Sequence, residues 1–316
     1  MKHNEQQFEG SDVSLAESAG RAMGTSAQIL VEAPCSDAAH ALADLGLHRA
    51  HLLERCWSRF RDDSELNALN ARAGQGPVDV SDDLALLVAR MVDAWLWTQG
   101  AFDPTVLRSM VSLGYDVDFS QLATQGPSTL PTDLTQAPGM AGIRVIDNTV
   151  TLPGHVGIDP GGIGKGLAAD IIASELLAAG ATGVLVNLGG DARAAGTCQG
   201  EPWQIGIRDD RSTSSPIVAE FDMGDQGVAT SSSLRRRWQG RHHLIDPNTG
   251  APTASDVLQA TVFAPTAWQA EAMATVALVR GQEAFLQWAS SNAYSAYLFG
   301  PEGDPLVIHA KESINA

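Results

Sequence analysis

The chain carries its one internal lysine in a glycine-rich segment, Asp159–Gly166, with the sequence DPGGIGKG. Glycines let a backbone bend sharply and approach a ligand closely, because they have no Cβ. The ammonium group of Lys165 in such a bend predicts a contact with phosphate, and a surface loop with a chance lysine is the alternative. The segment is not a Walker A motif, which has Gly at the position of Asp159 and Ser or Thr at the position of Gly166, and it lacks the Gly-x-Gly-x-x-Gly spacing.

A dense basic cluster follows the hydroxyl-bearing run Thr230–Ser233. It comprises Arg235, Arg236, Arg237, Arg241, His242 and His243. Hydroxyl and guanidinium groups together suit phosphate oxygens, and a histidine can transfer a proton near neutral pH. An exposed arginine-rich hairpin is the structural alternative. A serine hydrolase is disfavoured because no Gly-x-Ser-x-Gly segment is present, and a zinc site lacks a distant fourth ligand.

Glu271 and Thr275 stand four residues apart in a helix predicted to begin near Ala267, so their side chains share one face. A carboxylate and a hydroxyl can hold Mg²⁺, which takes oxygen ligands and usually shares them with substrate phosphates. A solvated glutamate beside a threonine is the more common situation. The run Asn187–Asp191, NLGGD, predicts a sharp turn with amide and carboxylate groups at its rim, and a purely structural turn is its alternative.

Two aromatic residues stand next to predicted helix ends. Phe102 follows one helix and precedes Asp103, and Phe60 precedes the helix that starts at 63–67. Either ring could stack on a planar ligand. Core packing is the simpler explanation of each ring taken alone.

The composition is that of an acidic globular protein. The chain has 316 residues, 44% apolar and 18% charged, and a formal net charge of -17. This charge disfavours nucleic acid and anionic membranes as partners. Cys35, Cys56 and Cys198 are widely separated, which predicts free thiols in a reducing compartment. No signal peptide, lipobox or membrane-length apolar stretch is present, so the sequence predicts a cytoplasmic protein without membrane insertion.

The hydrophobic pattern predicts an α+β fold in a single large mixed domain over 21–312, preceded by a disordered tail over 1–20. The predicted helices cover 36–57 with Ser36 as N-cap, a short stretch from 63, 81–100, 166–179, 267–280 and 282–291. The predicted strands cover 25–32, 183–187, 203–208, 216–222, 257–263, 294–299 and 305–309. A hairpin is predicted at 143–152 and a long loop over 115–140.

The order of these segments resembles the ApbE family of FAD:protein FMN transferases over roughly residues 20–300. The matching segments are Met23–Thr25, Ser64–Asn70, Ala101–Thr105, Asp159–Gly166 with Asp170, Asn187–Asp191, Trp203–Ile207, Thr230–Ser231, His243–Gly250 and Ala270–Thr275. The resemblance implies a T-fold-like domain that uses FAD as substrate and Mg²⁺ as cofactor. Family members cleave the FAD pyrophosphate, attach FMN by a phosphodiester to Thr or Ser of an acceptor flavoprotein or FMN-binding domain, and release AMP.

The resemblance also implies site residues by position. The FAD site would be lined by Met23, Phe60, Ala101, Phe102, Asp103, Asp159, Lys165 and Ile245. The metal would be held by the backbone carbonyl of Gly162 and by the side chains of Glu271 and Thr275, and His243 would transfer the proton of the acceptor hydroxyl.

Glu271 departs from the family pattern, because it stands where an aspartate is usual. Its longer side chain displaces the carboxylate by about one C–C bond, and Mg²⁺ demands near-ideal octahedral geometry. Three interpretations therefore stay open at this point. They are an active transferase, a diverged member that only binds flavin or hydrolyses FAD to FMN and AMP, and a non-flavin interaction module on the same fold.

Overall fold

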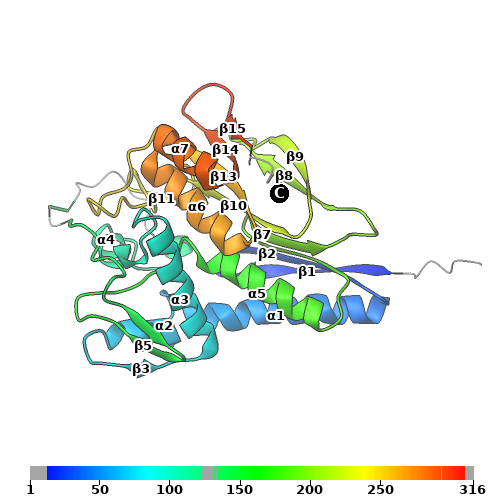
Figure 1. The fold of residues 1–316 in the computed structure, drawn as a ribbon, viewed down its shortest axis with the longest axis horizontal. Coiled ribbons are helices and arrows are strands. Elements are labelled where there is room, and N and C mark those ends of the chain that lie inside the picture. Colours follow the sequence, from blue (N-terminus) through cyan, green and yellow to red (C-terminus); the bar gives the residue numbers. More distant parts are fainter. Residues whose placement is uncertain (1–12, 123–130, 133, 293, 310–316) are drawn as a thin grey trace, which may run out of the picture.

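An eight-stranded sheet forms the centre of the computed structural model, which describes residues 13–122, 131–132, 134–292 and 294–309 (Figure 1). Its strand order is β1-β2-β6-β7-β10-β13-β14-β15, and every neighbouring pair is antiparallel. The strands are β1 Ser14–Ala22, β2 Thr25–Ala33, β6 Gly183–Leu188, β7 Asp191–Gly196, β10 Gln226–Ser232, β13 Gln259–Ala264, β14 Ser295–Phe299 and β15 Leu306–Ile308. The antiparallel sheet with separate helices confirms the predicted α+β class.

Four helices pack on one face of this sheet (Figure 1). They are α1 Ser36–Trp57, α5 Gly164–Ala178, α6 Ala267–Arg280 and α7 Gln282–Asn292. Successive side chains of a strand point to opposite faces, so alternate residues of each strand meet the helices. In β6, Val184 and Val186 belong to the core beneath the helices, whereas Leu185 belongs to a second core on the opposite face.

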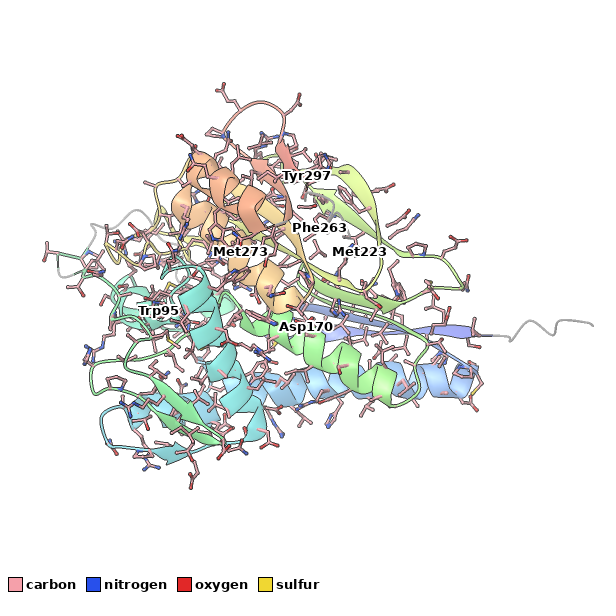
Figure 2. The ribbon with its side chains drawn as sticks, in the orientation of Figure 1. Trp95, Asp170, Met223, Phe263, Met273 and Tyr297 are labelled. Carbon is pink, nitrogen blue, oxygen red and sulfur yellow. The ribbon has the colours of Figure 1, made fainter. Side chains whose placement is uncertain are left out.

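The second core lies between the sheet and a hairpin made of β8 Trp203–Arg208 and β9 Ile217–Met223. Met223, Phe263 and Tyr297 are found near this hairpin (Figure 2). Phe221 of β9 joins the two elements, because its ring centroid is 5.0 Å from that of Phe263 and 5.2 Å from that of Tyr297. The sheet is therefore covered on both faces, by helices on one and by a hairpin on the other.

Smaller elements gather near the C-terminal end of α1 (Figure 1). They are α2 Glu65–Ala71, α3 Asp82–Trp97, a 3-10 turn Pro104–Val106, α4 Leu107–Ser112, a 3-10 turn Phe119–Gln121, and a small sheet of β3 Val78–Asp79, β5 Thr149–Thr151 and β4 Arg144–Ile146. The remaining hairpin pairs β11 Arg237–Trp238 with β12 Arg241–His242. The β4–β5 pair confirms the hairpin predicted over 143–152. In the described ranges, no helix is both long enough and apolar enough to cross a bilayer.

The N-terminal prediction is wrong where the structure describes it. Residues 14–20 belong to β1, which pairs with β2 over the nine residues of each strand. The segment is polar and alternates only weakly, so its sequence does not indicate a strand. Its extended form depends on backbone hydrogen bonds to β2. Residues 1–12 and the predicted domain end at 312 lie outside the described residues. Ser36 is the first residue of α1 rather than its N-cap, which is Cys35.

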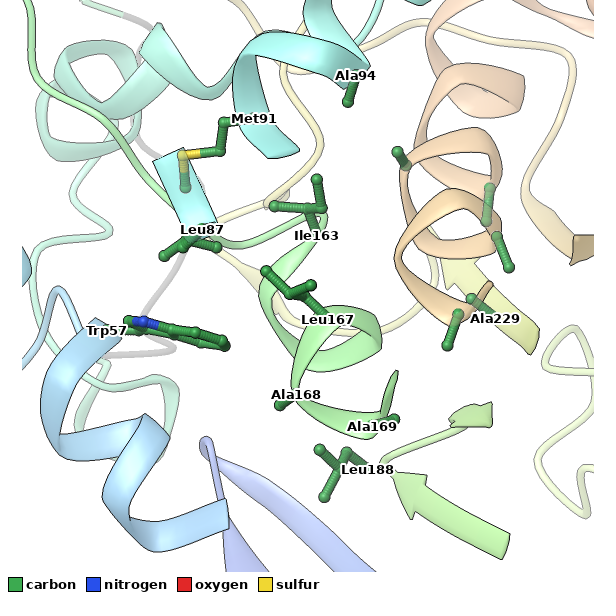
Figure 3. Close-up of a cluster of buried hydrophobic side chains, with 14 of the residues drawn as sticks. Trp57, Leu87, Met91, Ala94, Ile163, Leu167, Ala168, Ala169, Leu188 and Ala229 are labelled. Atoms are coloured by element: carbon green, nitrogen blue, oxygen red, sulfur yellow. The ribbon is translucent and has the colours of Figure 1, made fainter. Parts of the chain in front are cut away.

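A close contact between α5 and α6 depends on Gly166. A Cβ at Gly166 would lie 2.3 Å from the carbonyl oxygen of Ala267, so only glycine lets the two helices approach this closely. The neighbouring residues of α5, among them Leu167 and Ala168, are buried between the α1–α3 side and the sheet (Figure 3). This contact holds the first turn of α5 beside the start of α6.

We expect Gly166→Ala to lower the free energy of unfolding by about 2 kcal/mol or more, because its Cβ would overlap backbone atoms that cannot rotate away. Urea unfolding at pH 7 measures the effect. Gly224→Ala is the matched control, since a Cβ at Gly224 would meet nothing within 4 Å. Equal stability of the two variants would contradict the close packing of α5 on α6.

Asp170 of α5 holds the beginning of α6. Its Oδ1 accepts a hydrogen bond from the Ala267 N–H and its Oδ2 accepts one from the Trp268 N–H, both at 2.9 Å. Thr266, the N-cap residue of α6, makes no side-chain capping bond. Asp170 therefore caps α6 from the neighbouring helix α5 (Figure 2). Burial raises the pKa of Asp170 to about 6, which leaves the carboxylate ionised at pH 7.

We expect Asp170→Ala to lower the free energy of unfolding at pH 7 by about 2 kcal/mol, because two N–H groups at the start of α6 lose their acceptor. Thermal and urea unfolding measure this loss. Asp93→Ala is the control, since Asp93 forms an exposed ion pair with Arg90 and its removal should cost less than about 1 kcal/mol. A loss no larger than that of the control would show that α6 does not need this cap.

Candidate functional site

A cavity of about 1140 Å³ opens at the end of the large sheet where several turns meet. The β1–β2 turn contributes Met23, the segment before α5 contributes Gly162, and the β6–β7 turn contributes Gly189. The end of β10 contributes Thr230 and Ser231. Pockets for small molecules usually measure about 300–1,000 Å³, so this cavity can take a ligand as large as a dinucleotide.

The walls of this cavity contain all twelve residues that the sequence analysis assigned to the site. They are Met23, Phe60, Ala101, Phe102, Asp103, Asp159, Gly162, Lys165, His243, Ile245, Glu271 and Thr275. These residues come from segments that lie far apart in the sequence, and the fold brings them to one surface. Their separate roles with FAD, metal and proton stay predictions.

The β6–β7 turn confirms the sharp bend predicted over Asn187–Asp191. Gly189 and Gly190 both have positive φ, 72° and 101°. A Cβ at Gly189 would lie 2.2 Å from Oγ1 of Thr25, so the turn packs directly on the start of β2. This arrangement places Asp191, the first residue of β7, at the cavity wall.

Lys165 lies between two buried carboxylates. Its Nζ is 2.7 Å from Oδ2 of Asp191 and forms a second ion pair with Oε1 of Glu271. Burial alone would lower the pKa of Lys165, but the two carboxylates outweigh it and the net pKa is raised. Lys165 stands in the first turn of α5, which begins at Gly164, two residues earlier than the predicted start. The lysine is thus a charged member of a cluster and not an isolated cation.

Glu271 is held by both of its oxygens. Besides the ion pair with Lys165, its Oε2 accepts a 2.8 Å hydrogen bond from the N–H of Gly166. Burial raises the pKa of Glu271 to about 7, against the opposing effect of Lys165. With Glu271 ionised, the cluster of Lys165, Asp191 and Glu271 carries a formal charge of one negative unit, since one ammonium faces two carboxylates.

The predicted metal donors lie next to this cluster. A Cβ at Gly162 would lie 3.1 Å from Oγ1 of Thr275, so the loop backbone and the hydroxyl are neighbours. Oγ1 of Thr275 is also 3.4 Å from Oγ of Ser231. All of these donors are oxygens, which fits a hard cation such as Mg²⁺. No group of three or more His, Cys, Asp or Glu side chains within the described part of the chain could hold a metal, so a cation here would need hydroxyl, carbonyl and ligand oxygens as well.

Phe102 and Asp103 are fixed by the loop that follows α3. A Cβ at Gly162 would lie 2.8 Å from the Phe102 ring, which places this ring against the glycine-rich segment. Oδ1 of Asp103 accepts hydrogen bonds from the N–H of Thr105 at 2.8 Å and from its hydroxyl at 2.6 Å. Burial raises the pKa of Asp103, while the two bonds from Thr105 oppose the shift.

The basic segment divides between the cavity and the protein core. Arg235, Arg236 and His243 line the cavity. Arg241 is buried and donates from Nη1 to the carbonyl oxygen of Leu113 at 3.0 Å, and Nε2 of His242 is 3.2 Å from the carbonyl oxygen of Thr253. The exposed arginine-rich hairpin considered above therefore does not describe the whole segment.

His243 is a half-buried histidine whose environment favours the neutral ring. Burial first, and then the positive charges of Arg236 and other nearby groups, lower the pKa of His243 well below its ordinary value. Its Nδ1 is buried and has no hydrogen-bond partner among the residues that the structure describes. The residue lines the cavity, and a neutral imidazole there can accept a proton from a bound hydroxyl.

Arg59 and Tyr115 are the site residues that sequence reasoning missed. Nε of Arg59 is 2.9 Å from Oδ2 of Asp159, and Nη1 donates to the carbonyl oxygen of Tyr115 at 2.7 Å. Arg59 and Asp159 are 100 positions apart, and no periodic pattern joins them. One feature of the sequence could have indicated Arg59. It directly precedes Phe60, and the family resemblance places Phe60 in the FAD site.

Comparisons with known proteins agree on one family. A family model described as "ApbE family" matches residues 23–299. A protein of Treponema pallidum called FAD:protein FMN transferase is 35% identical over 250 residues, which are 73% of this chain and 68% of that protein. A protein of Escherichia coli K12 with the same name is 29% identical over 259 residues, which are 78% of this chain and 73% of that protein.

Solved structures show the same similarity in three dimensions. The flavin transferase ApbE of Vibrio cholerae superposes with a TM-score of 0.78 at 25% identity, over 95% of this chain and 98% of that one. The ApbE protein of Thermotoga maritima superposes with a TM-score of 0.80 at 26% identity, over 94% of this chain and 97% of that one. Both similarities extend over nearly the whole chain and therefore include the elements that build the cavity.

Proposed function

Because this chain belongs to the ApbE family, we propose that it is an FAD:protein FMN transferase, which moves FMN from FAD to a threonine or serine hydroxyl of an acceptor protein. The observation that carries the proposal is the convergence of all twelve predicted site residues on one cavity of dinucleotide size. The names of the relatives and the similarity to a flavin transferase structure support the same activity.

The charges of the cavity support a requirement for a divalent cation. With Glu271 ionised, the cluster of Lys165, Asp191 and Glu271 carries one net negative formal charge, which does not attract a pyrophosphate. We assign the carbonyl of Gly162, the carboxylate of Glu271 and the hydroxyl of Thr275 as the residues that would hold Mg²⁺. A bound Mg²⁺ would neutralise charge on the phosphate oxygens.

Residues of this chain would position the rest of the substrate. Lys165 and Arg236 face the same cavity and can stabilise negative charge that develops on the phosphate oxygens. Phe60, Phe102 and the backbone near Met23 can hold planar rings, and Asp103 and Asp159 offer acceptors for polar groups of the ligand. Phosphoryl-type transfer depends on such positioning and charge more than on a protein nucleophile.

His243 would act as the general base. The hydroxyl oxygen of the acceptor forms a new bond to the phosphorus of the FMN half, and the bond from this phosphorus to the bridging oxygen breaks. The bridging oxygen leaves with AMP, and the proton of the hydroxyl passes to the neutral imidazole of His243. The lowered pKa of His243 keeps the ring unprotonated at pH 7, and the position of the residue at the cavity wall is what supports this role.

The deciding experiment measures AMP release from FAD with Mg²⁺ or EDTA, with and without a peptide that carries an acceptor threonine. Mg²⁺-dependent AMP release together with FMN covalently bound to the peptide is the expected result. Release of AMP with free FMN would replace the proposal by FAD hydrolysis, and bound but intact FAD would replace it by flavin binding alone. Absence of any flavin binding would overturn the assignment to flavin chemistry.

A further inference from the structure

The guanidinium of Arg59 is buried, yet one of its nitrogens is unused. Its side chain is 5% exposed, and two nitrogens are engaged by Asp159 and by the backbone of Tyr115. Nη2 is buried and finds no hydrogen-bond partner in the described ranges of the chain. Buried donors are nearly always paired, so an unpaired arginine nitrogen beside a cavity points to a ligand acceptor.

The surroundings of Arg59 form an aromatic corner of the cavity, which we define as Phe60, Tyr115 and Phe119. Cζ of Arg59 lies 4.0 Å from the centroid of the Phe60 ring and 4.5 Å from that of Tyr115. These rings fix the plane of the guanidinium and offer apolar surface to a flat ligand. The corner therefore suits a planar ring more than an extended chain.

The net charge around Arg59 indicates whether its unpaired nitrogen would bind a charged or a neutral acceptor. Its positive charge is already balanced by Asp159, whose side chain is 9% exposed and which also accepts a 2.8 Å hydrogen bond from the N–H of Gly161. Burying a pyrophosphate, which carries two negative charges, beside a neutral ion pair would leave the charge of the pyrophosphate uncompensated. A neutral carbonyl oxygen needs only one donor and no net charge.

We propose that Arg59 is a binding residue for the flavin ring, donating a hydrogen bond from Nη2 to one of the carbonyl oxygens of its pyrimidine-dione half. This inference rests on the proposed function for the identity of the ligand. It adds a specificity determinant, because a planar ring without a carbonyl at this edge would leave the buried nitrogen unpaired. Asp159 then acts as a positioning residue that orients the guanidinium.

The test is the affinity of wild type and Arg59→Lys for FAD and for riboflavin, measured in EDTA by quenching of flavin fluorescence. Lysine keeps a positive charge for Asp159 but lacks Nη2, so we expect both ligands to bind about tenfold more weakly or worse. Arg49→Lys is the matched control, because Arg49 is also paired with carboxylates but lies outside the cavity, and it should bind both flavins like wild type.

Each other result overturns the proposal in a different way. Weakened FAD binding with unchanged riboflavin binding would show that Arg59 contacts the phosphates and not the flavin ring. Unchanged binding of both ligands would show that Arg59 contacts neither part of the ligand. If wild type binds neither riboflavin in EDTA nor FAD after Mg²⁺ is restored, the proposed function fails and this inference fails with it. Flavin binding by wild type leaves the proposed function standing whatever the Arg59 variant shows.

A second measurement uses only wild-type protein and so does not depend on the folding of the variant. Sulfur is a much weaker hydrogen-bond acceptor than oxygen. Either 2-thioriboflavin or 4-thioriboflavin should therefore bind about tenfold more weakly than riboflavin, and the weaker one identifies the carbonyl that faces Arg59. Equal affinity for all three flavins would overturn the proposed hydrogen bond.

Discussion

Replacing Glu271 with alanine should reduce Mg²⁺-dependent AMP release from FAD by about a thousandfold, to the level seen in EDTA. Glu271 supplies the carboxylate among the three residues assigned to the metal, and it is 2% exposed. It also orders two neighbouring groups, Lys165 and the N–H of Gly166. Steady-state AMP release at saturating Mg²⁺ measures the loss, and near-normal turnover would remove Glu271 from the metal site.

One further variant at this position and one control elsewhere separate chemistry from structure. Glu271→Asp keeps a carboxylate and restores the residue that the family resemblance predicts here, so it should retain Mg²⁺-dependent turnover or increase it. Complete loss in that variant would mean that the site is built around the longer side chain. Glu283→Ala in α7 removes an exposed glutamate outside the cavity and should behave like wild type.

Replacing Lys165 with alanine should lower the free energy of unfolding by about 3–5 kcal/mol, because two buried carboxylates would lose their shared cation. The side chains of Asp191 and Glu271 are each 3% exposed, so the lysine is the main compensation for their charge in the folded state. The same change should weaken FAD binding, since it leaves the cavity more negative. Urea unfolding and flavin fluorescence measure the two effects on the same samples.

Lys165→Arg is the matched variant, because it keeps the positive charge beside Asp191 and Glu271. It should lose clearly less stability than Lys165→Ala, even though the larger side chain must be accommodated. A loss below about 1 kcal/mol in Lys165→Ala would contradict the buried ion pairs. Unchanged affinity for FAD in that variant would remove Lys165 from the phosphate site.

Local patterns predicted most helices and many strands of this fold. The helices predicted at 36–57 and 267–280 match α1 and α6. A helix that buries one face has apolar residues at intervals of three and four positions, and this spacing can be recognised in the sequence. The strands β7 Asp191–Gly196 and β10 Gln226–Ser232 were not predicted as strands. Both contain small or polar residues, and their extended form depends on pairing with each other and with β6 and β13.

The sequence by itself selected twelve residues that line one cavity, because the order of nine short motifs identifies a family and each motif is local in the sequence. Only the tertiary structure decided how these residues act on one another. It paired Lys165 with Asp191 and Glu271, Arg59 with Asp159, and the Phe102 ring with Gly162. Charges and burial depend on distances between remote segments, and those distances exist only once the sheet has brought the segments together.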